Sequence, residues 1–409
     1  MRTEKISSRP IQKNSPEPLD VGRRFDRCIL ACGAELKNTF CITSDGQVFV
    51  SPNYGDLETL EAMERYESNI SDWLETLNCQ PDAVAFDMHP EYLSTKYALS
   101  LESVGEKVAV QHHHAHIASC MADCRVDGPV IGVALDGLGY GLDGQMWGGE
   151  FLVASYSGFW RAAHLKPVHL PGGAVSIRQP WRMAAVWLYD TFGEDFLKLD
   201  IPFAKIVDPD EWNILRHMIE KSFNSPLTTS MGRLFDAVSS IILVKKTVDY
   251  EAQAAIELEN AAKGNTRDER CYEFAVNEVE GAQTFGSLES IPQGNFSLVV
   301  DTSPIVRGVV RDIENGVDTG EMAAGFHYTI AALIEEVCAR IREICGGLND
   351  VALSGGVFQN RLLMANTVPL LEKAGFHVLT PERVPVNDGG ISLGQAVIAD
   401  EILSGRGER

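Results

Sequence analysis

The stretch Val130–Ala154, "VIGVALDGLGYGLDGQMWGGEFLVA", decides the fold. Its apolar run Val130–Asp136 indicates a buried strand, Gly137–Gly144 a glycine-rich turn, and Gly149–Ala154 a returning strand. A similar pattern occurs over residues 28–50, where short runs of β-forming residues are separated by Gly and Asp-Gly. The sequence therefore predicts an architecture that starts over, with a β-hairpin opening each half of the chain.

Strands alternate with helices around these hairpins, which predicts an α/β fold. In the first half, a helix expected over Leu57–Leu77 precedes buried strands at Ala83–Asp87 and Val108–Val110. After Ser155 the pattern is mostly helical, and the strand–helix alternation resumes at Asp350. We predict a flexible N-terminal segment over residues 1–27, a first lobe over 28–127 and a second lobe over 128–409. The second lobe contains a largely helical insertion over about 156–300.

The composition excludes several classes of protein. At 409 residues, 45% apolar and 22% charged, the chain resembles a soluble protein of two or three lobes. It has neither a run of 18 apolar residues nor a signal-peptide pattern, so we expect no membrane association and a cytoplasmic location. Nine scattered cysteines indicate reduced thiols, and a net charge of −22 argues against nucleic acid as a partner.

Four histidines lie within five residues in "VQHHHAHIASC", Val110–Cys120. Apolar flanks place them inside the fold rather than in a tag. On a helix, His112 and His116 share one face and could bind one metal ion, whereas His113 and His114 point elsewhere, toward phosphates or solvent. A purely structural role for the histidines remains open at this point.

Two histidines do not complete a metal site, so a carboxylate must come from elsewhere in the chain. Asp388 in "NDGG" is the candidate, and Asp136 is its competitor. The alternative for Asp388 is a helix N-cap.

Two glycine motifs are candidates for binding a nucleotide. "DGLGYGLDG" (residues 136–144) lacks the following helix of a dinucleotide fingerprint, but a hairpin of glycines lets backbone N–H groups approach a phosphate. Ser354, Gly355 and Gly356 in "LSGGVFQN" stand between a strand and a helix, where α/β sheets bind ligands. With one motif in each half, the two could close on a nucleotide between lobes. Each could equally be a structural turn, and there is no Walker A motif.

Two further segments carry polar residues on expected helices. "SMGRLFDAVSSI" (Ser230–Ile241) places Arg233 and Asp236 on an otherwise apolar helix, for which the ordinary alternative is a partly exposed helix with an internal ion pair. "YEAQAAIELE" (Tyr250–Glu259) has Glu251 near its start, where solvated polar residues are common.

Together these segments resemble the carboxy-terminal half of the hydrogenase maturation carbamoyltransferase family HypF. The resemblance runs in order from about residue 28 to residue 397. Its pieces are "GAELKNTFCIT", "GDLETLEAMERYE", "DMHPEYLSTKYA", "VQHHHAHIASCMAD", "GVALDGLGYGLDGQMWGGEFLVA", "LPGGAVSIRQPWRMA", "SMGRLFDAVSSI", "YEAQAAIELE", "LSGGVFQNRLL" and "VNDGGISLGQA".

The resemblance implies a two-lobed ATPase-like fold of the actin and hexokinase type, built from duplicated RNase H-like units. It implies a divalent metal, zinc or iron, on His112, His116 and Asp388, with Mg²⁺ as a further candidate, and a bound ATP or carbamoyl-adenylate. The implied catalytic residues are Lys37, Asp136 and Asp236. The implied nucleotide contacts are Asp136, Gly137, Gly139, Tyr140, Gly232, Asp236, Glu251, Ser354, Gly355, Gly356 and Asn360.

In that family, carbamoyl-adenylate is made from carbamoyl phosphate and ATP. Its carbamoyl group passes to the C-terminal cysteine thiol of HypE, on the way to the cyanide ligands of [NiFe]-hydrogenase. The implied partners are the HypE tail and the acylphosphatase and YrdC-like adenylate-forming domains, in the same or a separate chain. Full-length members carry these domains and a zinc-finger-like domain ahead of this region, and none has room before residue 28. We therefore expect an isolated module or a naturally short protein that transfers the carbamoyl group but does not make the adenylate.

Three other functions are compatible with the same motifs. One is carbamoyl transfer to a hydroxyl of a small molecule, and another is a tRNA threonylcarbamoyl-transferring ATPase, which the acidic charge disfavours. The third is a nucleotide-dependent scaffold without chemistry.

Overall fold

A computed structural model describes residues 16–265, 270–281, 283–286 and 296–405. It contains two β-sheets with helices around them, which confirms the predicted α/β class. Most of the expected N-terminal segment, residues 1–15, lies outside the described residues. In the part described, no helix combines the length and the apolar character needed to cross a membrane.

The first sheet has the strand order β1-β4-β3-β2-β5-β6. Its strands β2, β3 and β4 form an antiparallel meander, and β2, β5 and β6 are parallel. Asp45 and Gly46 connect β3 to β4 with φ values of 50° and 82°, which suits the Asp-Gly hairpin turn. The strand bounds are Pro18–Leu19, Ile29–Ala31, Cys41–Ser44, Gln47–Val50, Ala83–Asp87 and Glu106–Val110 for β1 to β6.

The second sheet repeats this order. Strands β9, β8 and β7 form an antiparallel meander, and β7, β15 and β16 are parallel, with further strands added beyond β9. The same order in both sheets confirms the predicted duplication. The bounds are Val130–Tyr140, Met146–Ser155, Gly158–Leu165, Val168–His169, Leu227–Thr228, Ala275–Glu280, Gln283–Gly286, Phe296–Asp301, Asp350–Ser354 and His377–Leu379 for β7 to β16.

Two predictions for the second half were wrong. The glycines expected in a turn lie largely in a strand, because β7 continues through Gly137 and Gly139 to Tyr140 with a register shift after Leu135. The mostly helical pattern expected after Ser155 also missed β9, which forms the third strand of the meander. The two aromatic residues in its "GFW" start are fully buried on the sheet.

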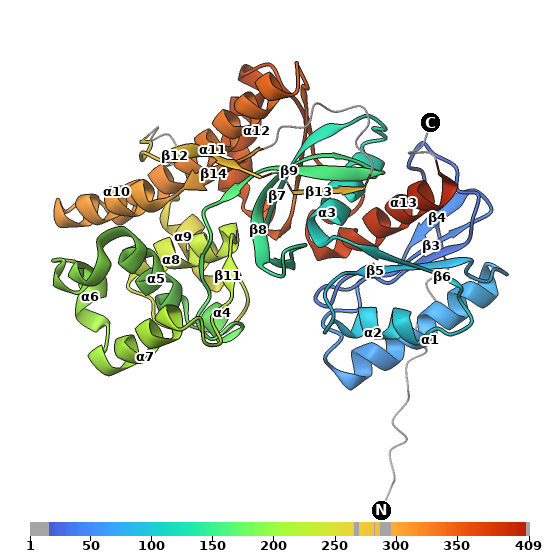
Figure 1. The fold of residues 1–409 in the computed structure, drawn as a ribbon, viewed down its shortest axis with the longest axis horizontal. Helices are drawn as coiled ribbons and strands as arrows, with labels where there is room; N and C mark the ends of the chain where they lie inside the picture. The colour runs from blue at the N-terminus through green and yellow to red at the C-terminus, as the bar shows by residue number, and fades with distance from the viewer. Residues whose placement is uncertain (1–15, 266–269, 282, 287–295, 406–409) are drawn as a thin grey trace, which may run out of the picture.

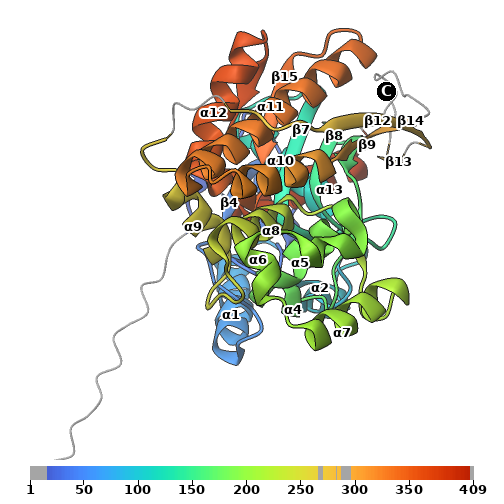
Figure 2. The same ribbon diagram turned by 90° about the vertical axis from the view of Figure 1, so that its left-hand side faces the viewer.

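The helices between β9 and β15 pack mainly on one another. Helix α8 contacts α5, α9, α10 and α11, and these five helices share one large apolar core with the second sheet. Figure 1 shows them on the left, away from the first sheet, and Figure 2 views the molecule from that side. Helix bounds are Leu60–Thr76, Leu93–Ser100, His112–Asp123, Val175–Arg178, Pro180–Phe192, Pro202–Ile206, Pro209–Glu220, Met231–Leu243, Gln253–Ala261, Ser303–Glu314, Thr319–Ile344, Arg361–Lys373 and Ile391–Ser404 for α1 to α13.

Helices α3 and α13 cross between the two sheets. Helix α3 follows the first sheet in the chain but packs on β7, β8 and β15, whereas the last helix, α13, packs on β2, β3 and β5 (Figure 1). They meet where Gly394 leaves no space for a side chain, because a Cβ there would collide with the carbonyl of Ala115. The chain thus returns at its end to the sheet with which it began.

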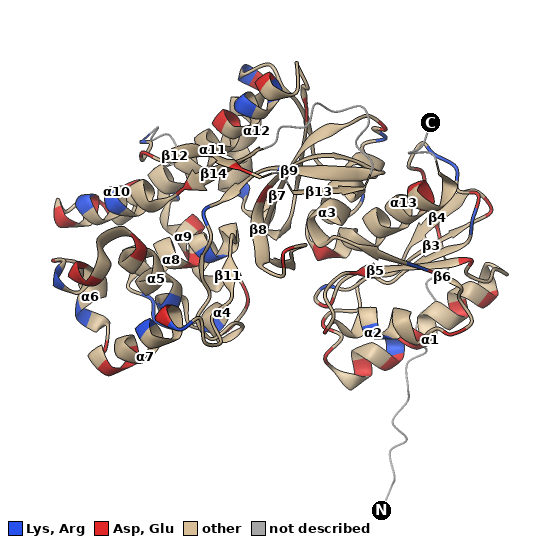
Figure 3. Cartoon of the chain, viewed as in Figure 1, with Lys and Arg blue, Asp and Glu red and all other residues tan. Residues whose placement is uncertain are grey.

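Most charged side chains lie on the outside of this arrangement. Figure 3 shows acidic and basic residues along the outer helices, while the crossing of α3 and α13 is largely uncharged. The few ionisable side chains buried at this crossing therefore need partners inside the protein.

Candidate active site

The histidine run forms the start of helix α3, directly after β6. The helix is capped by Gln111, whose side chain accepts the His114 backbone N–H, and all twelve of its residues are buried. His112 and His116 lie one turn apart with ring centroids 5.1 Å from each other. The predicted common face is therefore present.

Both candidate carboxylates meet these histidines. Asp136 Oδ2 lies 2.9 Å from His116 Nε2 and 3.5 Å from His112 Nε2. Asp388 Oδ1 lies 3.6 Å from His116 Nε2. One ligand atom from each of the four residues falls within 4.8 Å of the others. The competitor Asp136 therefore joins Asp388 instead of replacing it.

The outer nitrogens of the two imidazoles have partners that fix the rings. His112 Nδ1–H donates to Asp87 Oδ2 at 2.7 Å, and His116 Nδ1 lies 3.3 Å from the Ser354 hydroxyl. Such bonds leave the Nε2 atoms facing inward, as in metal-binding histidines. His112 Nε2 is buried and makes no hydrogen bond to any described residue.

The histidines and carboxylates of this four-residue cluster shift one another's pKa values. Burial would raise the pKa of Asp136, but the imidazoles of His112 and His116, which lie beside its Oδ2 atom, hold it well below its usual range. Burial would lower the pKa of His112, but Asp87 and Asp136 raise it well above its usual value. The cluster offers two imidazole nitrogens and two carboxylate oxygens, and one of these nitrogens, His112 Nε2, has no hydrogen bond among the described residues. This set of ligand atoms suits a divalent zinc or iron ion. The ligand roles stay a prediction.

The two glycine motifs meet, though not between lobes as expected. Both lie in the second sheet, because β7 and β15 are parallel neighbours. Asp136 Oδ1 joins them by accepting the N–H groups of Gly137 at 2.7 Å and Gly356 at 3.2 Å. Gly355 has φ 107°, and a Cβ there would collide with the carbonyl of Leu135, so the second motif requires glycine.

Helix α8 begins against the same hairpin. The Ser230 hydroxyl donates to the carbonyl oxygens of Asp136 and Gly137 and caps the helix. A Cβ on Gly232 would lie 3.0 Å from Gly137 Cα, so the helix start and the strand are in close contact.

The ion pair on α8 is buried, contrary to the partly exposed alternative. Arg233 Nη2 lies 2.8 Å from Asp236 Oδ2, and both side chains are about 5% exposed. Burial raises the pKa of Asp236 to about 6 although Arg233 lowers it.

Lys37 and Glu251 join the first sheet's meander to the helical region. Lys37 Nζ donates to both carboxylate oxygens of Glu251 at 2.9 Å. Burial would lower the pKa of Lys37, but this bond and the charges of Asp388 and Asp136 raise it. Lys37 therefore lies within the electrostatic field of the cluster.

Two predicted nucleotide contacts have structural partners. Asn360 caps α12 through Oδ1, and its Nδ2 donates to His327 Nε2 at 2.9 Å. The Tyr140 carbonyl accepts a hydrogen bond from Gln111, and its ring meets His89 edge-on. A nucleotide contact from either side chain stays a prediction.

Of the two alternatives for His113 and His114, phosphates or solvent, the structure excludes solvent. His113 and His114 are at most 1% exposed, and burial lowers their pKa values to about 3 and about 4. His114 Nε2–H donates to the Ser155 carbonyl at 2.6 Å.

Sequence reasoning missed Asp87, Gln111 and the pair Glu150–Arg161. A signal existed for Asp87, because "AVAFD" ends a buried strand with Asp just as "VALD" does at Asp136. In the pair, Arg161 Nε donates to Glu150 Oε2 at 2.7 Å and its guanidinium lies 3.8 Å from the Trp147 ring centroid.

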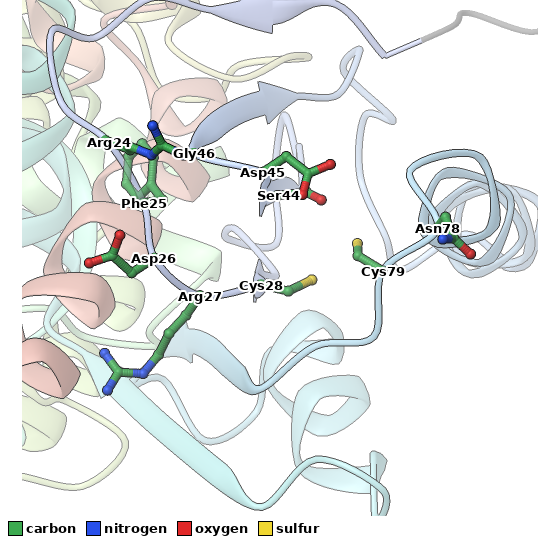
Figure 4. Close-up of a pocket in the computed structure, with 10 residues that line it drawn as sticks. All are labelled: Arg24, Phe25, Asp26, Arg27, Cys28, Ser44, Asp45, Gly46, Asn78 and Cys79. Carbon is green, nitrogen blue, oxygen red and sulfur yellow. The ribbon is translucent and has the colours of Figure 1, made fainter.

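A pocket of about 310 Å³ lies elsewhere in the first sheet. Figure 4 shows Cys28, Cys79 and the turn at Asp45 around it. Cys28 precedes β2 and Cys79 precedes β5, so the pocket lies at the amino ends of the parallel strands, whereas the cluster gathers at the carboxyl ends. Burial raises the pKa of the Cys28 thiol, so it stays protonated.

Two family models match the chain. One described as the HypF Kae1-like domain covers residues 24–123, and one described as the second subdomain of the carbamoyltransferase Kae1-like domain covers residues 132–395. Carbamoyltransferase HypF of Synechocystis sp. is 35% identical over 93% of this chain and 48% of its own length. A carbamoyltransferase HypF homolog of Cupriavidus necator is 36% identical over 91% of both chains.

Two solved structures share the fold. A full-length HypF in a phosphate- and nucleotide-bound form has a TM-score of 0.86 and 39% identity, covering 96% of this chain and 58% of that one. HypF of T. kodakarensis has a TM-score of 0.80 and 30% identity, covering 98% and 50%. The chain spans about half the length of several curated relatives.

Proposed function

The chain belongs to the HypF carbamoyltransferase family, and from this premise we propose that it is the carbamoyl-transfer module of hydrogenase maturation. It takes carbamoyl-adenylate, made from carbamoyl phosphate and ATP, and transfers the carbamoyl group to the C-terminal cysteine of HypE. The acylphosphatase and YrdC-like domains supply the adenylate, from the same or a separate chain. The observation that carries the proposal is the convergence of His112, His116, Asp136 and Asp388 beside both glycine motifs.

The nucleotide is proposed to bind along the hairpin and the Ser354–Gly356 turn. Both lie at the carboxyl ends of the parallel strands β7 and β15, where α/β sheets bind ligands. Gly137, Gly139 and Gly232 leave bare backbone there, and a solved relative is described as nucleotide-bound. Lys37 supplies positive charge for a phosphate when it leaves Glu251.

The four-residue cluster fits a divalent cation, held by His112, His116, Asp136 and Asp388. When bound, such an ion supplies positive charge that neutralises the adenylate phosphate. Asp87 and Ser354 hold the two imidazoles in the orientation that this binding needs.

The proposed reaction is an acyl transfer. The partner's thiolate forms a bond to the carbamoyl carbon, the bond from that carbon to the phosphate oxygen breaks, and AMP leaves with the electron pair. The thiol proton must be removed first, and Asp236, with its pKa raised to about 6, is our candidate acceptor. Lys37 neutralises the phosphate as AMP departs. The nucleophile belongs to the partner, so no cysteine of this chain is required.

The test uses synthetic carbamoyl-adenylate, a peptide of the HypE tail and the metal-loaded protein. Mass spectrometry should show one carbamoyl group added to the peptide cysteine, and His112→Ala should abolish the addition while the protein stays folded. A folded, metal-loaded protein that adds nothing to the peptide contradicts the proposal. Carbamoylation of an alcohol without the peptide, or tight tRNA binding at physiological salt, would identify the corresponding alternative instead.

A further inference from the structure

The Gln111 side chain has a fixed orientation at the start of α3. Its Oε1 accepts the His114 backbone N–H at 2.9 Å, which only the amide oxygen can do. The amide nitrogen must therefore be the atom that lies 3.0 Å from the Tyr140 carbonyl and 3.2 Å from His113 Nδ1. An amide nitrogen only donates, so His113 Nδ1 accepts.

This contact assigns the tautomer of His113. Because Nδ1 accepts, the ring is neutral and its proton resides on Nε2. That Nε2–H is completely buried and has no hydrogen-bond partner among the described residues. His114 differs, since its Nε2–H already donates to the Ser155 carbonyl. A buried donor without an acceptor is costly, so the unpaired donor requires an explanation.

The His113 ring packs against the glycine hairpin. A Cβ on Gly139 would lie 2.5 Å from His113 Cε1, the ring carbon between Nδ1 and Nε2. The His112 ring, with its inward Nε2, is 5.3 Å away between centroids. Trp147 does not account for the donor, since its ring is 6.1 Å away and tilted by 41° rather than met edge-on. The His113 ring that carries the donor thus lies beside the glycine backbone of β7 and next to one imidazole of the four-residue cluster.

We propose that His113 is a neutral hydrogen-bond donor to the ligand, with Nε2–H donating to a phosphoryl or carbamoyl oxygen bound along the hairpin. This inference rests on the proposed function and adds a ligand-binding residue to it. A neutral imidazole suits the role, because it polarises an oxygen without placing a second charge beside the cation of the neighbouring site.

Variants at two neighbouring histidines test the inference. His113→Phe keeps the ring and removes the donor, whereas His113→Gln keeps an N–H near the Nε2 position. Affinity for carbamoyl-adenylate should fall about 10- to 100-fold in the Phe variant and return largely in the Gln variant. The matched control is His114→Phe, which should lower the melting temperature and leave affinity unchanged. Metal content is measured in each variant, so that loss of the cation is recognised.

AMP distinguishes the two oxygen sources, because it has the phosphate and lacks the carbamoyl group. Weaker AMP binding in His113→Phe assigns a phosphoryl oxygen, and an effect seen only with carbamoyl-adenylate assigns the carbamoyl oxygen. Unchanged affinity for both ligands overturns the inference. If the wild-type protein fails to carbamoylate the HypE peptide while His113→Phe still loses AMP affinity, the proposed function fails and the donor role stands.

Nitrogen NMR of the histidine-labelled wild-type protein needs no variant that might unfold. The ligand-free protein should show His113 protonated at Nε2 alone, and this N–H signal should shift on addition of AMP or carbamoyl-adenylate. A proton on Nδ1, or no shift with either ligand at saturation, overturns the assignment.

Discussion

The two sheets have the same strand order, yet they contribute to the site differently. In the first sheet the meander strands are three or four residues long, whereas β7 and β8 of the second are 11 and 10 residues long. The longer hairpin accommodates a register shift between Leu135 and Gly139, and Asp136 lies in that shift. The first sheet instead ends β5 with Asp87, which supports His112 from behind. The repeated topology thus brings strand ends of both sheets to the histidines, and the central carboxylate, Asp136, comes from the longer hairpin.

The largest expected effect is at the second sheet's carboxylate. Asp136→Asn keeps the shape but loses the charge between two histidines, so we expect metal content to fall and carbamoyl transfer to drop by about 10²- to 10³-fold or more. Peptide mass spectrometry and metal analysis measure this. Asp143→Asn, in the same hairpin, is the control and should stay active, because its Trp147 N–H contact needs only an acceptor.

Asp87, the carboxylate of the first sheet, should contribute less to metal binding and carbamoyl transfer than Asp136. Asp87→Asn weakens the support of His112 without removing a group that faces the ligand, so a loss of about 10- to 100-fold in activity or metal affinity is expected. The same assays apply, with Asp82→Asn as control at the opposite end of the strand. An Asp87 variant as inactive as Asp136→Asn would remove the distinction between the two sheets.

The buried pair Glu150–Arg161 should stabilise the second meander. Arg161 holds the pKa of Glu150 at about 2, below its usual 4.5, against the effect of burial. A lowered pKa stabilises the fold above pH 4.5, and the contribution of about 3 kcal/mol disappears as pH falls toward 2. Urea unfolding should show Glu150→Gln destabilised by about that amount at pH 7, with the difference shrinking in acid.

A surface ion pair provides the comparison for Glu150. Glu257→Gln breaks the pair with Lys245, which is partly exposed, and should cost less than about 1 kcal/mol. Equal losses in the two variants would show that the Glu150–Arg161 pair has no special role in the longer hairpin.

The smallest effect concerns two glycines of β7. Gly139→Ala would place a Cβ 2.5 Å from His113 and 2.6 Å from His112, so we expect a loss of about 1–3 kcal/mol in thermal or urea unfolding. A Cβ on Gly137 would meet no atom within 4 Å, so Gly137→Ala should change stability by less than about 0.5 kcal/mol. Comparable losses at both positions would contradict the close packing of α3 on this strand.

Much of the fold was predictable because its signals are local. The apolar run before Asp136, the helical spacing in α1, α8 and α12 and the common face of His112 and His116 depend on residues within a few turns of each other. The failures have a physical cause too. Glycines permit both turns and close approaches in strands, so the sequence could not show that β7 continues to Tyr140. Likewise, β9 begins the long region whose sequence pattern is mostly helical, and its aromatic start alone does not indicate that it pairs with a neighbouring strand.

Periodicity along the chain was enough to predict the alternation of strands and helices, the repeated hairpin and the pair of histidines. Only the tertiary structure decided that Asp136 and Asp388 both reach the histidines, and that Gln111 orients His113 against Tyr140. Asp388 arrives because α13 returns to the first sheet and crosses α3, and this crossing depends on packing between segments far apart in the chain. Local patterns specify which groups are available, whereas long-range packing decides which of them meet.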